Sequence, residues 1–269
     1  MASNCQIPTP QVYVRQMLDY IDYSEDLYGK RVLENSCGEG NILLEVVTRY
    51  IENAKKEKRS LDDIKLGLSR DIVAYEIDKD CITKCKKRLN KLVHSYGLKG
   101  IRWNIKSKDF LQESITNTYD YVIGNPPYQE EADSDSATNG QKPRKNIFQH
   151  FQIQADKIAS ESSVLIYPGG RWIHQSGKGL KEFGKNLIND HRLSSVEFYP
   201  DAKEVFGNAA DLADGVTIVT KKKEKNTAGF EYIYAVKGSE KKVHVDNPGD
   251  DLIPLNPNDI QITNKIKRF

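Results

Sequence analysis

The sequence of 269 residues contains little cysteine, which limits the ways it can be held together. Its four cysteines, Cys5, Cys37, Cys81 and Cys85, are too few and too irregularly spaced for a disulfide framework. Cys81 and Cys85 lie on one expected helix and could suggest a metal-binding pair. No second Cys/His pair at suitable spacing completes four ligands, so we expect no metal site.

Long apolar runs and a strong net charge are also missing. The longest apolar runs, such as residues 163–167, have the length of a strand, and the first ten residues lack a signal-peptide pattern. We therefore expect no membrane span and a cytoplasmic location. The formal net charge of +2 says little about partners, because attraction to nucleic acid depends on where charge lies. The lysine-rich run 221–225 is typical of a solvated strand end, with a phosphate-binding patch as the alternative.

Strand-like and helix-like segments alternate along the chain. Hydrophobic residues make up 38% of it and charged residues 29%, as in one large soluble domain. The expected strands are residues 31–34, 71–77, 101–105, 119–124, 164–167, 193–198 and 215–220, and the expected helices are residues 12–21, 41–51, 78–96, 146–158 and 179–189. The order predicts an α/β fold with a doubly wound, mostly parallel sheet and ligands at the carboxyl ends of strands.

Three stretches fall outside this alternation. Residues 52–63 read as a helix extension followed by a charged surface loop. Residues 130–145 are polar and lack apolar periodicity, which predicts a long mobile loop whose far end could bind phosphates. The basic residues available for this are Lys142, Arg144 and Lys145. Residues 230–269 offer two short strand candidates.

The most informative motif is Asn125-Pro126-Pro127-Tyr128, which follows the apolar strand expected at residues 119–124. The two prolines remove backbone donors and stiffen the turn, so the carbonyls of Asn125 and Pro126 become fixed acceptors. An amino group with two N–H donors fits them. Accepting both protons localises the nitrogen lone pair and makes a poor aromatic amine nucleophilic, while Tyr128 can stack on the ring. The alternative is a Pro-Pro turn that only ends the strand.

Glycines and acids follow the preceding expected strands. Gly38 and Gly40 would let the backbone approach a cofactor closely, although a structural turn has the same pattern. Glu76 ends the next strand and suits the two hydroxyls of a ribose, with an ordinary surface acid as the alternative. Asp109 and Phe110 offer an acceptor for an adenine amino group and an aromatic wall, unless they form a solvated loop.

The order of these motifs resembles the gamma-ordered, adenine-specific amino methyltransferases of DNA in restriction-modification systems, in the branch whose motif is NPPY. The motifs run in the order Thr9-Pro10, residues 34–41, Glu76, Asp109-Phe110 and residues 125–128. The resemblance covers about residues 7–222 and includes residues 147–151, 164–170, 198–206 and 214–220. It implies a seven-stranded sheet of the S-adenosylmethionine-dependent methyltransferase type.

The resemblance also implies a role for each site residue. The cofactor S-adenosylmethionine would be bound by Thr9, Pro10, Glu34, Asn35, Ser36, Cys37, Gly38, Gly40, Glu76, Ile77, Asp109, Phe110 and Asn125. The catalytic residues would be Asn125, Pro126, Pro127 and Tyr128. Phe206 would hold the flipped target base together with Tyr128, its alternative role being a core aromatic. The implied reaction is methylation of the exocyclic amino group of adenine in DNA, without a metal.

The sequence departs from the family pattern in two places near the first motif. Glu34-Asn35 stands where the family commonly has Asp-Pro, which keeps the acid and changes the stiffness of the turn. The separation between Glu34 and Glu76 is longer than usual, with the excess in residues 55–63. We expect cofactor affinity to reflect the first change.

A third departure concerns domain organisation. The family normally reads DNA with a separate recognition domain, and residues 223–269 are too short for one. We expect a catalytic domain at residues 1–222 and a short C-terminal extension at 223–269, with little DNA sequence specificity in this chain alone. Either the sequence is a catalytic fragment or a recognition domain or subunit comes from elsewhere; a companion endonuclease is a further expected partner.

Two other functions remain open. NPPY also serves enzymes that methylate structured RNA or a protein glutamine, but these usually carry a separate domain before the first glycine motif. The Thr9-Pro10 motif occupies that position here and favours DNA. The other alternative is a non-catalytic cofactor-binding subunit, against which the intact residues 125–128 argue.

Overall fold

A computed structural model describes residues 7–131, 144–177, 179–209, 212–223, 229–249 and 251–259. The chain divides into two compact units. Unit 1 comprises residues 1–8 and 26–159, and unit 2 comprises residues 9–25 and 160–269. The expected division into residues 1–222 and 223–269 stays a prediction.

Unit 1 contains a parallel sheet of four strands in the order β3-β2-β1-β4. The strands are β1 (Val32–Glu34), β2 (Ile72–Glu76), β3 (Asn104–Ser107) and β4 (Tyr119–Gly124). Both β1 and β2 are buried along their whole length, as expected for central strands covered on both faces. Glu34 pairs with Ala74 and Ile123, and Glu76 pairs with Ser107. The carboxyl ends of all four strands therefore meet at one edge.

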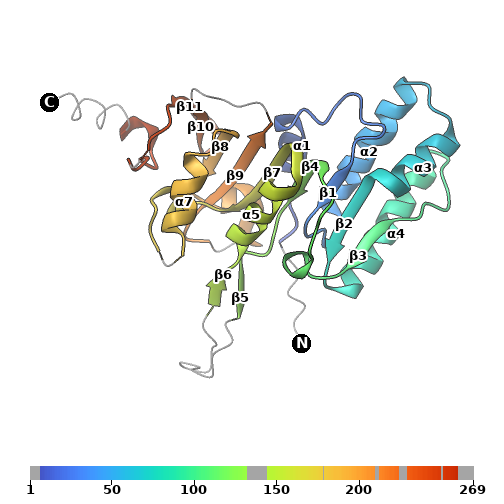
Figure 1. Ribbon diagram of the computed structural model, residues 1–269, viewed down its shortest axis with the longest axis horizontal. Helices are drawn as coiled ribbons and strands as arrows, with labels where there is room; N and C mark the ends of the chain where they lie inside the picture. The colour runs from blue at the N-terminus through green and yellow to red at the C-terminus, as the bar shows by residue number, and fades with distance from the viewer. Residues whose placement is uncertain are drawn as a thin grey trace. The chain divides into compact units, whose positions relative to one another are not determined.

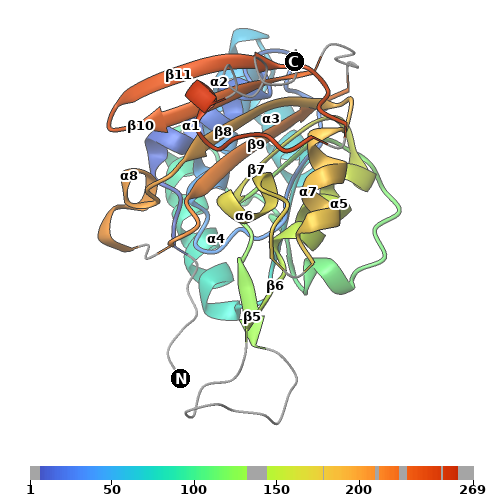
Figure 2. The ribbon, with the colours of Figure 1, turned by 90° about the vertical axis from the view of Figure 1, so that its left-hand side faces the viewer.

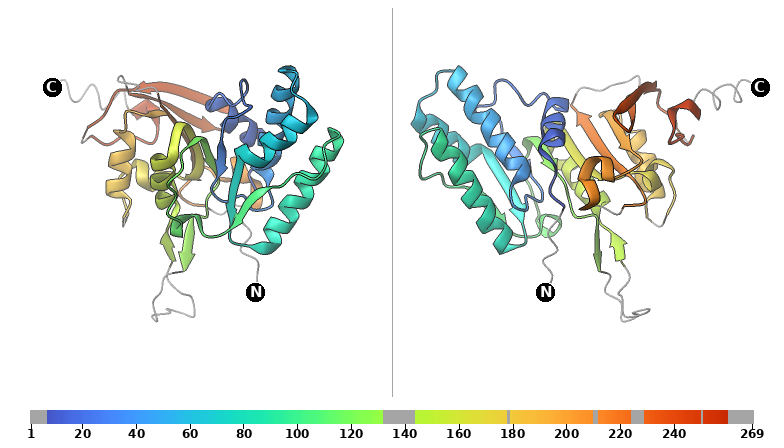
Figure 3. Two further views of the ribbon diagram at one scale, coloured as in Figure 1. Left: turned by 45° about the vertical axis from the view of Figure 1, so that its right-hand side comes forward. Right: turned by 180° about the vertical axis from the view of Figure 1, so that it is seen from behind.

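Helices of unit 1 pack beside these strands. They are α2 (Asn41–Lys56), α3 (Leu61–Asp71), α4 (Lys79–Ser95), η1 (Phe110–Gln112) and α5 (Phe148–Ile158). Helix α2 contacts both α3 and α4, which Figure 1 and both views of Figure 3 show, and α5 contacts β4 and η1. The sequence did not predict α3. Its Ser60–Asp63 capping box begins a helix whose Ile64 and Leu68 are buried.

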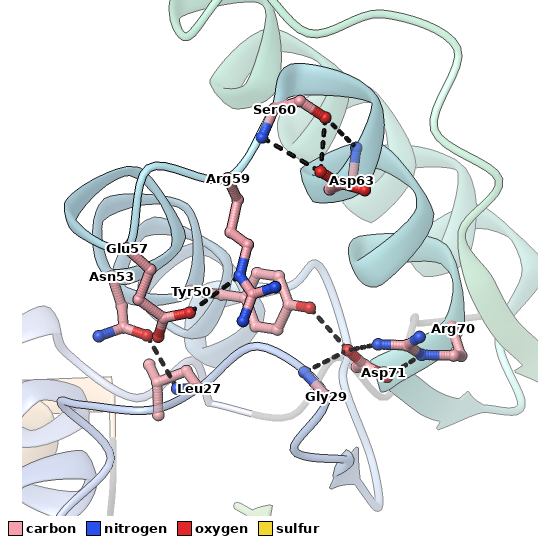
Figure 4. A network of polar contacts seen from close by, with 10 residues as sticks. All are labelled: Leu27, Gly29, Tyr50, Asn53, Glu57, Arg59, Ser60, Asp63, Arg70 and Asp71. Atoms are coloured by element: carbon pink, nitrogen blue, oxygen red, sulfur yellow. Dashed lines mark hydrogen bonds and ion pairs between the residues drawn. The ribbon is translucent and has the colours of Figure 1, made fainter.

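A polar network ties the chain before β1 to α2 and α3 (Figure 4). The carboxylate of Asp71, which is fully buried, accepts hydrogen bonds from the Gly29 N–H at 3.0 Å and the Tyr50 hydroxyl at 2.6 Å. It also pairs with the Arg70 guanidinium at 2.6 Å. Since Gly29 precedes β1 and Asp71 precedes β2, the network lies at the amino ends of the strands, away from their carboxyl edge.

A hairpin follows Tyr128 in unit 1. Strands β5 (Gln129–Glu131) and β6 (Arg144–Asn146) pair antiparallel, and the Ile147 N–H donates to the Tyr128 carbonyl at 3.1 Å. The prediction of one loop over residues 130–145 is therefore wrong at both ends, because backbone pairing there overrides polar composition. Lys145 lies 2.8 Å from the Glu130 carboxylate. Residues 132–143, with Lys142 and most of the predicted mobile loop, lie outside the described residues.

Unit 2 contains a mixed sheet in the order β7-β9-β8-β10-β11 (Figure 2). The strands are β7 (Ala159–Pro168), β8 (Leu193–Tyr199), β9 (Val216–Lys222), β10 (Phe230–Val236) and β11 (Ser239–Val245). β9 is antiparallel to β7 and β8, and β10 is parallel to β8 and antiparallel to β11. The helices are α1 (Gln11–Tyr20), α6 (Gly170–Ile173), α7 (Lys181–Ile188), α8 (Lys203–Phe206) and η2 (Gly207–Ala209).

The predicted α/β class is confirmed, with a different strand count. Apart from the β5–β6 hairpin, the described residues hold nine strands, four in unit 1 and five in unit 2, where seven were expected. The additional strands are β10 and β11, which extend the unit 2 sheet beyond β8. None of the described helices is long and apolar enough to cross a membrane.

The lysine run at the end of β9 is not a uniformly solvated strand end. Lys221 is only 4% exposed and lies 2.7 Å from the Asp190 carboxylate. Lys222 pairs with Asp22 at 2.6 Å, and the next lysine, at position 223, pairs with an acid on β7 at 3.1 Å. These acids lie in the same unit, so the three lysines at positions 221–223 form ion pairs within unit 2.

Candidate functional site

The turn after β1 approaches the end of β2 closely. The Cys37 N–H donates to the Tyr75 carbonyl at 2.9 Å, and the Gly40 N–H donates to the Cys37 carbonyl at 2.8 Å. Gly38 and Gly40 have φ angles of 50° and 86°, a region that favours glycine. A Cβ at Gly40 would lie 2.6 Å from the Cys85 Sγ. Glycine at position 40 therefore satisfies both a backbone and a packing requirement.

Glu76 holds this turn against β2. Its Oε2 accepts the Gly38 N–H at 2.8 Å, and its Oε1 accepts the N–H groups of Ile77 at 2.8 Å and Asp78 at 2.9 Å. Each carboxylate oxygen can accept two hydrogen bonds, so Oε2 keeps one acceptor position. The side chain of Ile77 is 70% exposed at the same strand end. One acceptor and an apolar surface therefore lie next to the glycine turn.

Glu34 lies beneath the turn and is 2% exposed. Burial raises the pKa of its carboxyl group well above the ordinary value, and the nearby Cys85 and Glu76 raise it further. Its Oε2 has no hydrogen-bond partner among the described residues. Burial therefore disfavours the charged form of Glu34 relative to an exposed glutamate.

Asp109 and Phe110 follow β3, and the structure gives them different environments. Asp109 is exposed and caps η1 by accepting the Leu111 N–H at 2.9 Å. Phe110 is buried between two other rings, with centroids 5.5 Å from Tyr75 and 5.5 Å from Phe151. In this state Phe110 is a core aromatic, and its role as a wall for adenine stays a prediction.

Asn125 directly follows β4, and hydrogen bonds restrain both its side chain and its backbone. It is 7% exposed, its Nδ2 donates to the Ile7 carbonyl at 3.0 Å, and its backbone carbonyl accepts a hydrogen bond from the Ser36 hydroxyl at 3.0 Å. Because the amide nitrogen serves Ile7, the orientation of the amide group is defined and Oδ1 is its acceptor. The contacts with Ile7 and Ser36 therefore fix both the side chain and the backbone of Asn125.

Tyr128 is half-buried as a whole residue, and its hydroxyl is buried. Burial raises the pKa of that hydroxyl, which has no hydrogen-bond partner among the described residues. The hydroxyl is therefore not the part of Tyr128 that a ligand can reach.

Most predicted site residues lie together in unit 1, at the carboxyl edge of its sheet. Residues 34–40, Glu76-Ile77, Asp109-Phe110 and residues 125–128 each follow one of the four parallel strands or end it. Thr9, Pro10 and Phe206 belong to unit 2, where Thr9 and Phe206 are buried. Their predicted roles stay predictions.

The sequence did not predict two contacts of Asn125, one with Ile7 and one with Ser36. Ile7 contributes a backbone carbonyl, which leaves no signature in residue type, and Ser36 was assigned to the cofactor alone. Cys37, Cys81 and Cys85 are buried and are not joined in a disulfide. Within the described ranges, no group of three or more His, Cys, Asp or Glu residues is placed to hold a metal ion.

The parallel sheet of unit 1 carries a glycine turn, an acid and an Asn-Pro-Pro-Tyr loop at its carboxyl edge. Residues 40–206 match the family described as the Eco57I restriction-modification methylases. The chain belongs to that family.

Curated relatives agree with this assignment. The chain is 28% identical over 129 residues to the type II methyltransferase M.XhoI of Xanthomonas vasicola, a match that covers 45% of this chain and 23% of the relative. It is 32% identical over 124 residues to the type II methyltransferase M.PaeR7I of Pseudomonas aeruginosa, covering 42% and 21% respectively. The matched region thus corresponds to less than a quarter of each relative.

Solved structures share the fold. A modification subunit of a putative type I restriction enzyme from Vibrio vulnificus YJ016 has a TM-score of 0.63 at 15% identity, covering all of this chain and 54% of that one. The type I restriction enzyme M protein of EcoKI has a TM-score of 0.61 at 13% identity, covering 87% and 49%. This chain therefore spans about half the length of these structural relatives.

Proposed function

We propose that this chain transfers a methyl group from S-adenosylmethionine to the exocyclic amino group of adenine in DNA, as the modification part of a restriction-modification system. The observation that carries the proposal is the geometry of Asn125. Its amide nitrogen donates to the Ile7 carbonyl at 3.0 Å, which orients the amide group with Oδ1 as an acceptor, and the Pro126 carbonyl is the next acceptor along the chain. Two such acceptors suit an amine with two N–H donors.

The residues at the carboxyl edge of unit 1 fit the cofactor. The positive φ angles of Gly38 and Gly40 allow close approach of the backbone. The acceptor position left on Glu76 suits a ribose hydroxyl, and the exposed side chain of Ile77 suits the face of a purine. Asp109 is exposed and can accept a hydrogen bond from an adenine amino group. When bound, S-adenosylmethionine supplies the electrophilic methyl group.

The chain's own contribution to the reaction is to hold and polarise the target. Asn125 and Pro126 accept hydrogen bonds from the two N–H groups of the amine. These bonds localise the lone pair on nitrogen without a strong base. The Tyr128 ring stacks on the flipped adenine and offsets the cost of removing it from the duplex, at about 1 to 3 kcal/mol for one aromatic ring. Phe206 is proposed as a second aromatic for the flipped base. Positioning of the amine in line with the methyl group provides the remaining acceleration.

The choice of DNA as the substrate rests on the family and on relatives. The family is one of restriction-modification methylases, and both curated relatives are type II methyltransferases. Structural neighbours include the DrdV–DNA complex, with a TM-score of 0.60 at 13% identity. We propose DNA, a target-recognition domain or subunit and a companion endonuclease as the partners.

The first prediction concerns Asn125→Ala. We expect methyl transfer to unmethylated double-stranded DNA of mixed sequence to fall about 100- to 1000-fold, the usual loss when one preorganised polar group that stabilises the transition state is removed. Affinity for S-adenosylmethionine should change little, because the lost acceptor acts on the target amine. Labelled-methyl incorporation measures the first and calorimetry the second.

Asn104→Ala, on the exposed edge of β3, is the matched control and should keep wild-type activity. Wild-type activity in Asn125→Ala would contradict the proposed mechanism. Methylation of RNA or of a protein glutamine, with none of DNA, would replace DNA as the substrate. Cofactor binding with no transfer to any of the three would indicate a non-catalytic subunit.

A further inference from the structure

The turn after β1 contacts the loop after β4 through a buried side chain. The Ser36 hydroxyl is 3.0 Å from the backbone carbonyl of Asn125 and 3.1 Å from Oδ1 of Asn35. Ser36 is 8% exposed, and the contact to Asn125 is buried. Water therefore cannot replace the hydroxyl without a rearrangement. The bond joins the predicted cofactor turn directly to the residue that is proposed to accept the target amine.

The two segments that this hydrogen bond joins are packed closely against each other. The Asn35 N–H donates to the Ile123 carbonyl at 3.1 Å, so the two segments are already in register. The Asn35 amide also covers Gly124, where a Cβ would collide with its Oδ1. Asn35 thus fills the space above Gly124, and Ser36 reaches the next residue along.

The position of the Asn125 carbonyl determines where the next acceptor points. The direction of this carbonyl reports the ψ angle of Asn125, which sets the plane of the Asn125–Pro126 peptide. The proline ring then restricts φ of Pro126. A hydrogen bond that holds the Asn125 carbonyl therefore also orients the Pro126 unit. Together with the Ile7 contact to Nδ2, it restrains both acceptors offered to the amine.

We propose that Ser36 is a positioning residue for methyl transfer: its hydroxyl aligns the Asn125 and Pro126 acceptors and couples that alignment to the cofactor turn. The inference rests on the proposed function, because it names a residue that prepares the same site. Ser36 touches the backbone of the acceptor loop, and it acts on the target amine through Asn125 and Pro126.

The test compares Ser36→Ala, Ser36→Thr and wild type in the full chain. We expect Ser36→Ala to lower the single-turnover rate of methyl transfer to DNA about 3- to 10-fold, which corresponds to one neutral hydrogen bond. This loss of rate should persist at saturating S-adenosylmethionine and DNA, whatever contribution Ser36 makes to cofactor affinity. Ser36→Thr keeps the hydroxyl and should restore most of the rate. Ser95→Ala, an exposed hydroxyl on α4, is the matched control.

Hydrogen exchange supplies a readout that needs no activity. In Ser36→Ala, the peptide that covers Gly124 to Gln129 should exchange faster, while peptides of α4 keep wild-type protection. Unchanged exchange together with a wild-type rate would overturn the role of Ser36. Parallel losses of rate, cofactor affinity and thermal stability without rescue by threonine would also overturn it, because they indicate a merely structural hydroxyl. A wild-type chain that does not methylate DNA would contradict the proposed function instead, and the exchange result would still decide whether Ser36 restrains the loop.

Discussion

Tyr128 shows how one side chain can serve two environments. Its hydroxyl is buried without a hydrogen-bond partner among the described residues, although the residue as a whole is only half-buried. An unpartnered buried hydroxyl costs free energy, so its presence contributes nothing favourable to stability by hydrogen bonding. The value of the residue therefore lies in the ring, which is the part that can stack on a planar base.

The second prediction follows from this division. Tyr128→Phe should keep methyl-transfer activity within about 2-fold of wild type and should not lower the free energy of unfolding. Tyr128→Ala removes the stacking surface and should weaken base capture by about 1 to 3 kcal/mol. Fluorescence of DNA that carries 2-aminopurine at the target position reports the capture. Equal losses in the two variants would assign the role to the hydroxyl and contradict this interpretation.

The third prediction concerns the buried acid Glu34. Burial raises the pKa of its carboxyl group well above the ordinary value. Such a group stabilises the fold fully below its unfolded pKa, and that contribution is lost as pH rises toward the folded pKa. Glu34→Gln removes the titration. The free energy of unfolding of the variant should therefore increase relative to wild type between about pH 5 and about pH 8.

Urea unfolding of both proteins at the two pH values measures this difference. Glu113→Gln, which alters a partly exposed acid paired with Lys108, provides a control without a fully buried charge. A difference between Glu34→Gln and wild type that does not vary with pH would show that Glu34 ionises freely in the folded chain.

At the scale of elements, α3 is the addition that lengthens the distance between the first two motifs. It packs on α2 through Gly67, where a Cβ would collide with the Tyr50 hydroxyl and lie 2.9 Å from Tyr28 Cε2. The same hydroxyl donates to Asp71 at 2.6 Å, as Figure 4 shows. Close approach of the two helices and the buried Asp71 network therefore depend on each other.

The fourth prediction tests this arrangement with Gly67→Ala. Alanine favours a helix by about 1 kcal/mol over glycine, but overpacking costs about 1 to 3 kcal/mol. The Tyr50 hydroxyl cannot move away from the new methyl group without breaking its hydrogen bond to Asp71. We expect a net loss of stability in denaturant unfolding. In a Tyr50→Phe background the same substitution should cost less, because the colliding oxygen is gone. Additive effects of the two substitutions would contradict the contact.

Whole-molecule stability should report the cofactor site. A ligand that binds only the folded chain at about 100 times its Kd stabilises it by about 2.7 kcal/mol, or about 5 to 10 °C in Tm for a chain of this size. The fifth prediction is that S-adenosylmethionine raises the Tm of wild type by this amount. Glu76→Gln should lose most of the shift, because it replaces the acceptor position that remains on Oε2.

Scanning calorimetry with and without the cofactor measures both shifts. Glu113→Gln should keep the full shift, since that acid lies outside the glycine turn. A Glu76→Gln variant that retains the wild-type shift would remove Glu76 from the cofactor site, and no shift in wild type would remove the site as a whole.

Much of the element order follows from the sequence because its signals are local. The strand predicted at residues 119–124 coincides with β4, and the helix predicted at residues 78–96 contains α4. Apolar runs and 3.6-residue periodicity determine these segments within a few turns of chain. They also place the Asn125 motif at the end of a strand and the glycine turn before a helix, so the main functional hypothesis needed no tertiary contact.

Only the tertiary structure decided how the site is held together. The bond from Ser36 to Asn125 joins residues 89 apart, and the one from Asn125 to Ile7 joins residues 118 apart. Neither has a sequence signature, because each uses a backbone carbonyl and depends on the register of parallel strands. The β5–β6 hairpin was missed for a related reason: its residues are polar, and its pairing comes from backbone hydrogen bonds. Local pattern determined which residues carry chemistry, and long-range register determined which of them meet.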